Sequence, residues 1–160
     1  MRRGFITKIL ERGRADAAYP VIRASVPGLG LAQWRRFVAA ATAEGSRQGI
    51  VVVENARGYI HALGCYRVDL DLLHGHTLAI DHAVVLDFLD DKVVATLLID
   101  AVDRQAQALG CQALEFRVRR VGADKPEDHP LTGCLVEAGY AIDSVRLVKI
   151  VGGGSPAPAV

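Results

Sequence analysis

The stretch AIDHAVVLDFLDDKVVATLLIDAV, residues 79–102, joins two different sequence patterns. Its first half alternates between apolar and polar residues, and this period of two predicts a half-buried strand. Its second half repeats apolar residues at helical spacing, which predicts a helix over residues 91–109. A tight turn between a strand and a helix is a common place for phosphate to bind. This turn, however, carries Asp90 and Asp91 and no glycine.

The length and composition of the chain are those of one globular domain. A chain of 160 residues can bury roughly 68–70% of the surface that its unfolded form exposes. The formal net charge is +1, so no basic excess supports binding to nucleic acid or to a membrane surface. No apolar stretch is long enough for a signal peptide or a membrane span. We expect a single domain over residues 1–151, with a flexible tail over 152–160.

The three cysteines give no sign of a disulfide framework. Cys65, Cys111 and Cys134 stand far apart in the sequence and form no CxxC pair. Free thiols in a reducing compartment are the expected state of such residues. The sequence therefore favours a cytoplasmic protein.

The other elements can be predicted on both sides of the central passage. Before it come a strand at GFITKIL, two helices between residues 14 and 44 divided by PGLG, a strand at GIVVVEN, and a long alternating strand at YIHALGCYRVDLDLL that ends in the turn HGH. After it come a strand at ALEFRVRRV, a loop at GADKPEDHP, a short helix at LTGCLVEAG, and one or two strands at YAIDSVRLVKIV. The order β-αα-βββ-α-β-α-β predicts an α/β (α+β) fold, a mixed sheet with a central antiparallel meander.

This order of elements resembles that of the GNAT superfamily of N-acetyltransferases, over roughly residues 4–151. In that family a strand of the type IEDLVV leads into Arg/Gln-x-x-Gly-x-Gly/Ala, and Ser/Thr-x-Leu-Leu then follows in a helix. Residues 80–85 are similar to that strand, Ala95 and Thr96 to the small residue and the Ser/Thr, and residues 98–99 to the apolar pair. LTGCLVEAGY is similar to the family's terminal Leu-Tyr-x-x-x-Gly-Phe helix. The resemblance implies a GNAT-like sheet with helices on both faces.

The resemblance also implies a cofactor, acetyl-CoA or another acyl-CoA, and the residues that would bind it. Backbone N–H groups of the strand would polarise the acyl carbonyl, and the start of the helix would bind the diphosphate. The cofactor-binding residues implied in this way are Val84, Val85, Leu86, Asp91, Lys92, Val93, Val94, Ala95 and Thr96. For the catalytic base the position-matched residue is Asp81, with His82, Asp69 or Asp71 as helpers.

The sequence departs from the family pattern at several positions that bind the cofactor or take part in the reaction. Asp90 stands at the family's Arg/Gln and Val93 at its first glycine, so a branched side chain and a negative charge lie where a phosphate would approach. Like charges at 4 Å repel by about 4 kcal/mol at an effective dielectric of 20. An aspartate is also an excellent N-cap, so a self-capped helix explains this turn better than a phosphate site does. In the last helix, Leu135 aligns with the tyrosine often used to protonate the thiolate, and Asp128 with the asparagine that often opens the helix.

The histidines are the remaining group of possible functional residues in the sequence. His61, His74, His76 and His82 lie close to several aspartates, and a His-x-His pair can bind zinc when both rings point the same way. Solvent-facing strand and hairpin positions account for these residues more simply, so we assign no metal-binding residue.

Three functions remain open at this point. The first is an N-acyltransferase acting on a small-molecule amine, a peptide N-terminus or a lysine. The second is a catalytically silent GNAT-like domain that binds or regulates, and the third is a metal-binding protein that uses the HGH hairpin. The long meander strands also offer an edge at which two copies could pair as a homodimer.

Overall fold

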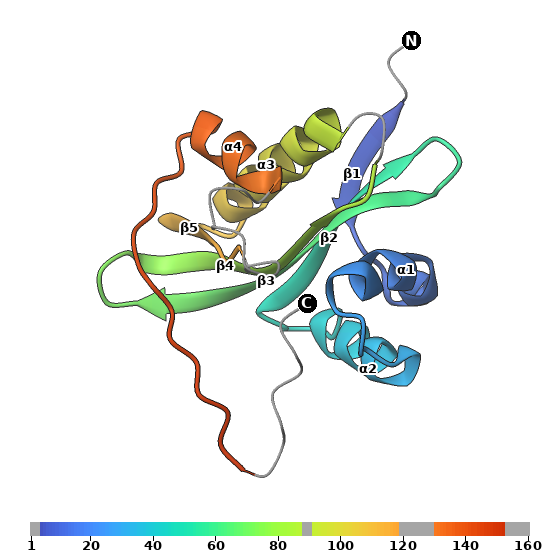
Figure 1. Ribbon diagram of the computed structural model, residues 1–160, viewed down its shortest axis with the longest axis horizontal. Coiled ribbons are helices and arrows are strands. Elements are labelled where there is room, and N and C mark those ends of the chain that lie inside the picture. The colour runs from blue at the N-terminus through green and yellow to red at the C-terminus, as the bar shows by residue number, and fades with distance from the viewer. Residues whose placement is uncertain (1–3, 88–90, 119–129, 153–160) are drawn as a thin grey trace. The chain divides into compact units, whose positions relative to one another are not determined.

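The chain forms two compact units, Met1–Arg117 and Val118–Val160. The computed structural model describes residues 4–87, 91–118 and 130–152. The first unit holds a five-stranded sheet in the order β1-β2-β3-β4-β5 (Figure 1). The strands are β1 (Phe5–Ile9), β2 (Gln48–Asn55), β3 (Ile60–Asp71), β4 (Gly75–Val85) and β5 (Ala113–Phe116). The first four pair in antiparallel fashion and β5 runs parallel to β4, which confirms the predicted meander and mixed sheet.

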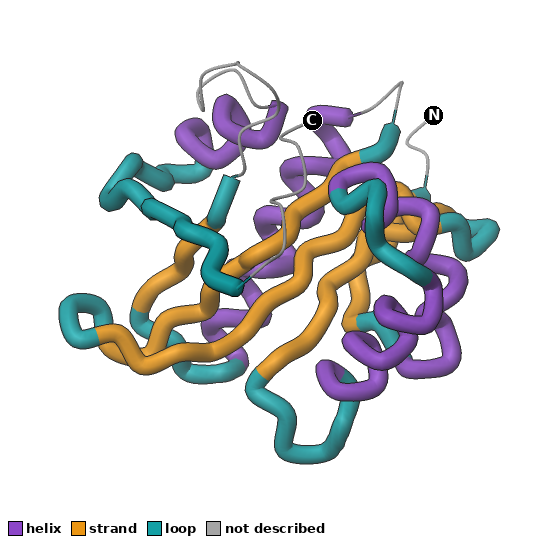
Figure 2. The backbone as a smooth tube through the Cα atoms, turned by 60° about the horizontal axis from the view of Figure 1, so that its bottom comes forward, coloured by secondary structure: helices purple, strands orange, loops and turns teal. Residues whose placement is uncertain are grey.

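Helices cover both faces of this sheet (Figure 2). A short 3-10 turn, η1 (Arg12–Arg14), leads into α1 (Ala15–Ser25), and α2 (Leu31–Ala41) follows after the predicted break at PGLG. α1 and α2 pack on one face, and α3 (Asp91–Ala108) packs on the other. α3 ends before Gly110, which adopts a φ of 69° that only glycine reaches without strain, as the sequence predicts.

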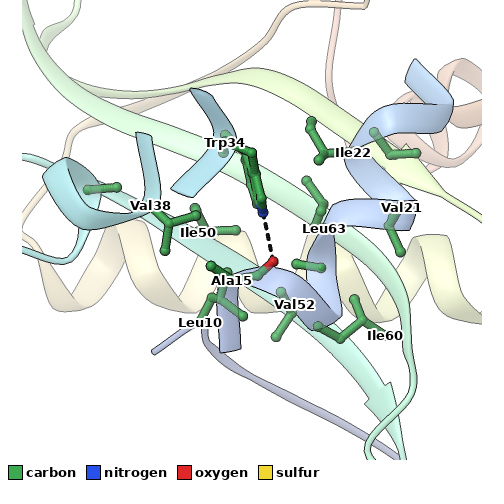
Figure 3. Close-up of a cluster of buried hydrophobic side chains, with 14 residues drawn as sticks. Leu10, Ala15, Val21, Ile22, Trp34, Val38, Ile50, Val52, Ile60 and Leu63 are labelled. Atoms are coloured by element: carbon green, nitrogen blue, oxygen red, sulfur yellow. Dashed lines mark hydrogen bonds between the residues drawn. The ribbon is translucent and has the colours of Figure 1, made fainter. Parts of the chain in front are cut away.

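The core under α1 and α2 is organised around Trp34 (Figure 3). This side chain is 2% exposed, and its indole N–H donates to the Ala15 carbonyl at 2.7 Å. The hydrogen bond ties α2 to the first turn of α1, while Ile50 and Val52 of β2 and Leu63 of β3 complete the cluster from the sheet. A buried indole with its polar atom satisfied fixes both the distance and the orientation of the two helices.

The core under α3 comes from the opposite face of the same strands. Val51, Val53, Ala62, Leu78 and Ile80 meet the apolar stripe of the helix. β2 therefore buries consecutive valines, one set on each face, which explains why its sequence reads as a continuous β-branched run. Among the described helices, none has the length and apolar character needed to cross a lipid bilayer.

The second unit contains α4 (Pro130–Glu137), which ends in a turn at Gly139 with a φ of 94°. Here the structure differs from the sequence prediction, because no strand forms over residues 140–152. Side chains of this segment are exposed, Leu147 by 92%. Alternating β-branched residues have a high β-propensity, but a strand also needs a neighbouring strand to pair with. Of the strand predicted at residues 113–121, the part at 119–121 lies outside the described residues, as does the tail beyond Gly152.

Candidate functional site

The parallel strands β4 and β5 separate after Ile80. Their ladder ends with the pair Ile80–Phe116, and the Arg117 N–H donates to the Ile80 carbonyl at 2.9 Å. β4 continues to Val85, whereas β5 ends at Phe116. β5 therefore leaves the outer edge of β4 unpaired from Asp81 to Val85, and among the described residues no other strand pairs with that edge.

A β-bulge lies at the point where the two strands separate. Cys65 of β3 pairs with His82, whereas the next residue, Tyr66, pairs with Ile80, so Asp81 is an extra residue in β4. A bulge of this kind bends the strand and redirects a side chain, and such bulges are over-represented next to active sites.

The direction of the backbone groups beyond the bulge follows from one hydrogen bond. The Leu86 N–H donates to the His61 carbonyl of β3 at 2.7 Å. Residues of an antiparallel strand turn their N–H and C=O groups alternately to one neighbour and the other, so Val84 also faces β3. Ala83 and Val85 then face the open edge. Of the three backbone donors named from the sequence, Val85 is the one that points outward.

Two arginines hold the Asp81 carboxylate. Arg67 donates to its Oδ2, and Arg117 donates to its Oδ1 at 2.8 Å. Each arginine also binds the carboxylate two residues away, Asp69 at 2.6 Å and Glu115 at 2.7 Å. Partial burial lowers the pKa of Arg67, but the hydrogen bond to Asp69 and the charge of Asp81 outweigh it and keep that pKa above its usual value. Each Asp81 oxygen therefore already accepts one hydrogen bond from a guanidinium, although each retains a second lone pair.

His82 follows the bulge and lies opposite Cys65. Its side chain is half-buried. Burial, reinforced by the charge of Asp81, raises the pKa of the Cys65 thiol to about 12. The thiol is therefore protonated at neutral pH and does not supply a nucleophile, although it lies close to the candidate site.

The first turn of α3 presents a mixed surface. The Asp91 carboxylate accepts the Lys92 N–H at 2.7 Å, so the helix already satisfies one of its own N-terminal donors. The Thr96 hydroxyl donates to the Lys92 carbonyl at 2.8 Å. Val93 is 53% exposed, whereas residues 94–95 are buried. Of the cofactor-binding residues predicted on α3, those at 94 and 95 thus serve the core.

Asp90, the expected N-cap, lies outside the described residues, and so does Asp128. The N-cap therefore stays a prediction.

A second group of polar side chains gathers where β4 ends. The Asp87 side chain is 3% exposed, and its Oδ2 lies 3.0 Å from Nδ1 of His61. Nε2 of the same imidazole lies 3.1 Å from Nδ2 of Asn55, and the ring of Phe5 meets it edge-on with centroids 5.2 Å apart. From the sequence, His61 is expected on a solvent-facing strand position, and Asp87 has no expected role. Only strand pairing brings the two together, so no local sequence signal could have linked them.

A cavity of about 420 Å³ opens beside His61, with Phe5, Asn55 and Tyr59 also in its walls. Its volume falls in the range of small-molecule sites, roughly 300–1,000 Å³. It lies at the ends of β1, β2 and β3 and does not include the open edge of β4. We take the β4 edge as the candidate active site because backbone donors, charged side chains and a helix N-terminus meet there.

The histidines of the β3–β4 hairpin are not arranged as a metal centre. His74 Nδ1 lies 3.3 Å from Asp71 Oδ1, and the same oxygen accepts the N–H groups of Leu73 and His74. These backbone donors, that of His74 first, lower the pKa of Asp71. Among the described residues, no three His, Cys, Asp or Glu side chains come together as a metal ion would require.

In the second unit, α4 carries the positions that match the family's last helix. Leu135 stands where the family often has tyrosine, and its carbonyl accepts the Tyr140 N–H at 3.0 Å in the turn after the helix. Cys134, beside it, is partly exposed. No hydroxyl stands at position 135 to protonate a thiolate.

The mixed sheet, with helices on both faces and a helix directly after its fourth strand, is the fold of solved N-acetyltransferases. Among solved structures, the chain is similar to glucosamine-6-phosphate N-acetyltransferase from Arabidopsis thaliana, with a TM-score of 0.71 and 15% identity over 93% of this chain and 99% of that one. It is also similar to ribosomal-protein-alanine N-acetyltransferase from Brucella melitensis biovar Abortus 2308, with a TM-score of 0.70 and 16% identity over 94% and 100%.

A third similar structure was solved with a ligand. Aminoglycoside N-acetyltransferase AAC(6')-Iy in complex with CoA has a TM-score of 0.70 and 14% identity, over 95% of this chain and 98% of that one. No family model matches the sequence, and no curated protein matches it either. At such low identities the likeness establishes the fold and leaves the activity to be argued from the site.

Proposed function

We propose that the protein is an acyl-CoA-dependent N-acyltransferase that transfers an acyl group, acetyl in the simplest case, to an amine. The observation that carries this proposal is the open edge of β4 beyond the bulge at Asp81, with α3 beginning a few residues later. The fold supports the proposal, because solved N-acetyltransferases share it over nearly the whole chain.

The open edge suits the extended arm of an acyl-CoA. Amide groups of such an arm can pair with the outward N–H and C=O groups of Ala83 and Val85, as a peptide strand adds to a sheet. The diphosphate would then face the first turn of α3, where backbone N–H groups and the positive end of the helix dipole favour an anion. Lys92 adds a positive charge, while Asp91 opposes the anion and would have to release the Lys92 N–H.

The reaction itself asks for little covalent chemistry from the protein. The neutral amine attacks the thioester carbonyl carbon, a C–N bond forms, and the C–S bond breaks to release a thiolate that takes up a proton. The amine loses its proton to water or to a side chain near the bulge, for which His82 and Asp81 are the candidates. The Val85 N–H would polarise the thioester carbonyl, which needs no particular side chain, and the Val85 C=O and the backbone groups of Ala83 would pair with the amides of the arm.

The charges around the bulge indicate the kind of acceptor. Asp69 and Glu115 are 47% and 45% exposed at their side chains, and they flank the pair of arginines on Asp81. Half-exposed carboxylates of this kind attract a cationic amine before it is deprotonated.

All three cysteines are free, in keeping with a reducing cytoplasm.

A catalytically silent domain of the same fold is the second candidate. It is favoured by the first turn of α3, where Asp91 already occupies a backbone donor, and by the two arginines that engage Asp81. In such a protein the unpaired edge of β4 would bind another ligand or none.

Calorimetric titration with acetyl-CoA, CoA and desulfo-CoA decides between the two. We expect micromolar binding, about −8 kcal/mol, for the acyltransferase. Val85→Pro should weaken binding without unfolding the sheet, because it removes an N–H that faces the open edge. Val85→Ala, the matched control, retains the N–H and should bind like the natural protein. Absence of both heat and thermal stabilisation at millimolar acetyl-CoA would leave the silent domain as the better account.

A further inference from the structure

Asp81 joins three neighbouring strands at the bulge of β4. Its carboxylate accepts one hydrogen bond from Arg67 of β3 and one from Arg117, the residue that follows β5. The three side chains are 26–29% exposed, so salt and water screen these contacts less than those of fully exposed pairs. The carboxylate therefore bridges β3 and β5 across the extra residue of β4.

Arg117 is held to β4 at two consecutive residues. Its backbone N–H donates to the Ile80 carbonyl at 2.9 Å, and its guanidinium donates to Asp81 at 2.8 Å. Its Nε–H also donates to Glu115 at 2.7 Å, which restrains the arginine side chain from its own strand. The end of the β4–β5 ladder is therefore fixed by backbone and side chain together.

Arg67 restrains the same carboxylate from β3 in a parallel way. It pairs with Ala79 of β4, and its Nε–H donates to Asp69 at 2.6 Å. Each arginine thus uses Nε for a carboxylate of its own segment and a terminal nitrogen for Asp81. Because a guanidinium is planar and its donors form a rigid fork, two such contacts fix the direction of each arginine.

The bend at the bulge determines how the open edge of β4 is presented. Ala83 and Val85, whose backbone groups face outward, follow Asp81 on the same strand. β5 does not pair with this part of β4, so the direction of the edge depends on β3 and on the bulge. A binding edge that already has its bound arrangement loses less entropy when the ligand arrives, and it therefore binds more tightly.

We propose that Asp81 is a positioning residue: together with Arg67 and Arg117 it fixes the bend of β4, and acyl-CoA binding at the open edge depends on these contacts. The inference rests on the proposed function for its ligand. In this role Asp81 acts through the two guanidiniums and the backbone. A base at the same position would instead take a proton from the amine, and its loss would leave CoA affinity unchanged.

Substitutions of Asp81 separate the two roles. Asp81→Asn replaces one acceptor oxygen by an amide nitrogen that faces a guanidinium, so we expect CoA affinity to fall by about tenfold. Asp81→Glu keeps a carboxylate for both arginines and should return the affinity to within about threefold of the natural protein. Asp16→Asn is the matched control, because Asp16 also accepts two arginine hydrogen bonds, from Arg35 at 2.8 and 2.6 Å, but between α1 and α2. It should leave CoA binding unchanged.

A double-mutant cycle tests whether Asp81 acts through Arg117. Arg117→Met removes the guanidinium, and it should weaken CoA binding less than Asp81→Asn does, because Arg67 remains. The variant that carries both changes should bind CoA about as weakly as Asp81→Asn alone, since both changes break the same contact. Losses that multiply would show that the two residues act independently and would overturn the positioning role.

Hydrogen exchange of backbone amides tests the contact without any cofactor. In Asp81→Asn the Arg117 amide, which donates to Ile80, should exchange about tenfold faster than in the natural protein. The Gln112 amide, which donates to the His76 carbonyl at 2.7 Å at the other end of this strand pair, is the internal control and should not change. Unchanged exchange at Arg117 would overturn the positioning role whether or not the protein binds CoA.

Calorimetry with CoA, at a temperature where every variant is folded, completes the test. Equal affinities for the natural protein and Asp81→Asn would show that Asp81 does not position the edge. If Asp81→Asn does not fold, Arg117→Met decides through the same two measurements. Natural protein that binds no CoA would overturn the proposed function and the dependence of ligand binding on Asp81, while exchange at Arg117 would still decide the structural contact.

Discussion

Cys65 shows at the scale of one residue how burial turns a reactive group into a structural one. Its pKa rises from 9.0 to about 12, first through burial and then through the charge of Asp81. Below pH 9 the thiol is protonated in both the folded and the unfolded chain. Between these two pKa values the unfolded chain releases the proton while the folded protein keeps it, so the stabilisation present below pH 9 is lost as the pH rises toward 12.

This linkage gives a prediction for alkaline stability. The natural protein should lose about 1.4 kcal/mol of unfolding free energy per pH unit above pH 9 through this thiol alone. Cys65→Ala removes that contribution, so its stability should fall less steeply over the same range, although it starts lower. Urea unfolding at a series of pH values measures both slopes, and parallel slopes would contradict the raised pKa.

Gly49 is a second residue whose neighbours fix its identity. A Cβ at this position would overlap the ring and hydroxyl of Tyr66, and that hydroxyl accepts the Gln105 Nε2–H at 2.9 Å, so the ring cannot move aside at no cost. Gly49→Ala should therefore destabilise the protein by about 1–3 kcal/mol in urea unfolding. Gly28→Ala is the control and should change stability little, because no described atom beyond the two chain neighbours lies within 4 Å of an added Cβ.

α2 provides a test at the scale of one element. Trp34 fills the core under α1 and α2 and also binds the Ala15 carbonyl. Trp34→Ala should cost about 3–5 kcal/mol of unfolding free energy, as large-to-small changes of buried aromatic residues do. Phe37 stacks on Trp34 but is exposed, so Phe37→Ala should lower the unfolding free energy much less. Similar losses for the two variants would mean that Trp34 does not organise this core.

The first turn of α3 yields a prediction about cofactor binding. Val93 is exposed and carries a branched side chain where close approach of a diphosphate needs none. CoA affinity should increase in the order Val93, Val93→Ala, Val93→Gly. Stability should fall by roughly half a kcal/mol for glycine, because it is a poorer helix former than valine. Calorimetry and thermal unfolding measure the two effects, and equal affinities for all three proteins would show that Val93 does not hinder the ligand.

The elements differ in how far the sequence could predict them. The meander and α3 can be predicted, because the spacing of apolar residues and the glycine that ends a helix are both local features of the sequence. The bulge at Asp81 cannot, and neither can a second one at His61, an extra residue of β3 between Ile60, which pairs with Glu54, and Ala62, which pairs with Val53. A single extra residue looks like ordinary alternation until its partner strand is known. For the same reason the Asp87–His61 contact and the arginines on Asp81 carry no local signal. The residues after Tyr140 show the opposite case. Their alternating sequence predicts a strand, but no neighbouring strand in the described part of the chain pairs with them, and no strand forms.

At the scale of the whole molecule, the two apolar clusters indicate which part of the chain folds as a unit. Both lie within the first unit, between Leu10 and Ala106. We therefore predict that a fragment of residues 1–117 unfolds cooperatively in urea, with a far-ultraviolet circular dichroism spectrum of mixed helix and sheet. A fragment without a cooperative transition would show that residues beyond Arg117 are needed for the core to form.

The two bulges have a consequence for insertions and deletions in the chain. Losing one residue elsewhere within β3 or β4 would turn the remainder of that strand over and bring polar side chains into the core. Losing Asp81 would leave the strand pairs on either side of it as they are, Cys65 with His82 and Tyr66 with Ile80. Losing His61 would keep Ile60 opposite Glu54, but it would remove the carbonyl that accepts the Leu86 N–H. What Asp81 adds to the protein is a bend in the strand and a polar group at that bend, neither of which the pairing itself requires.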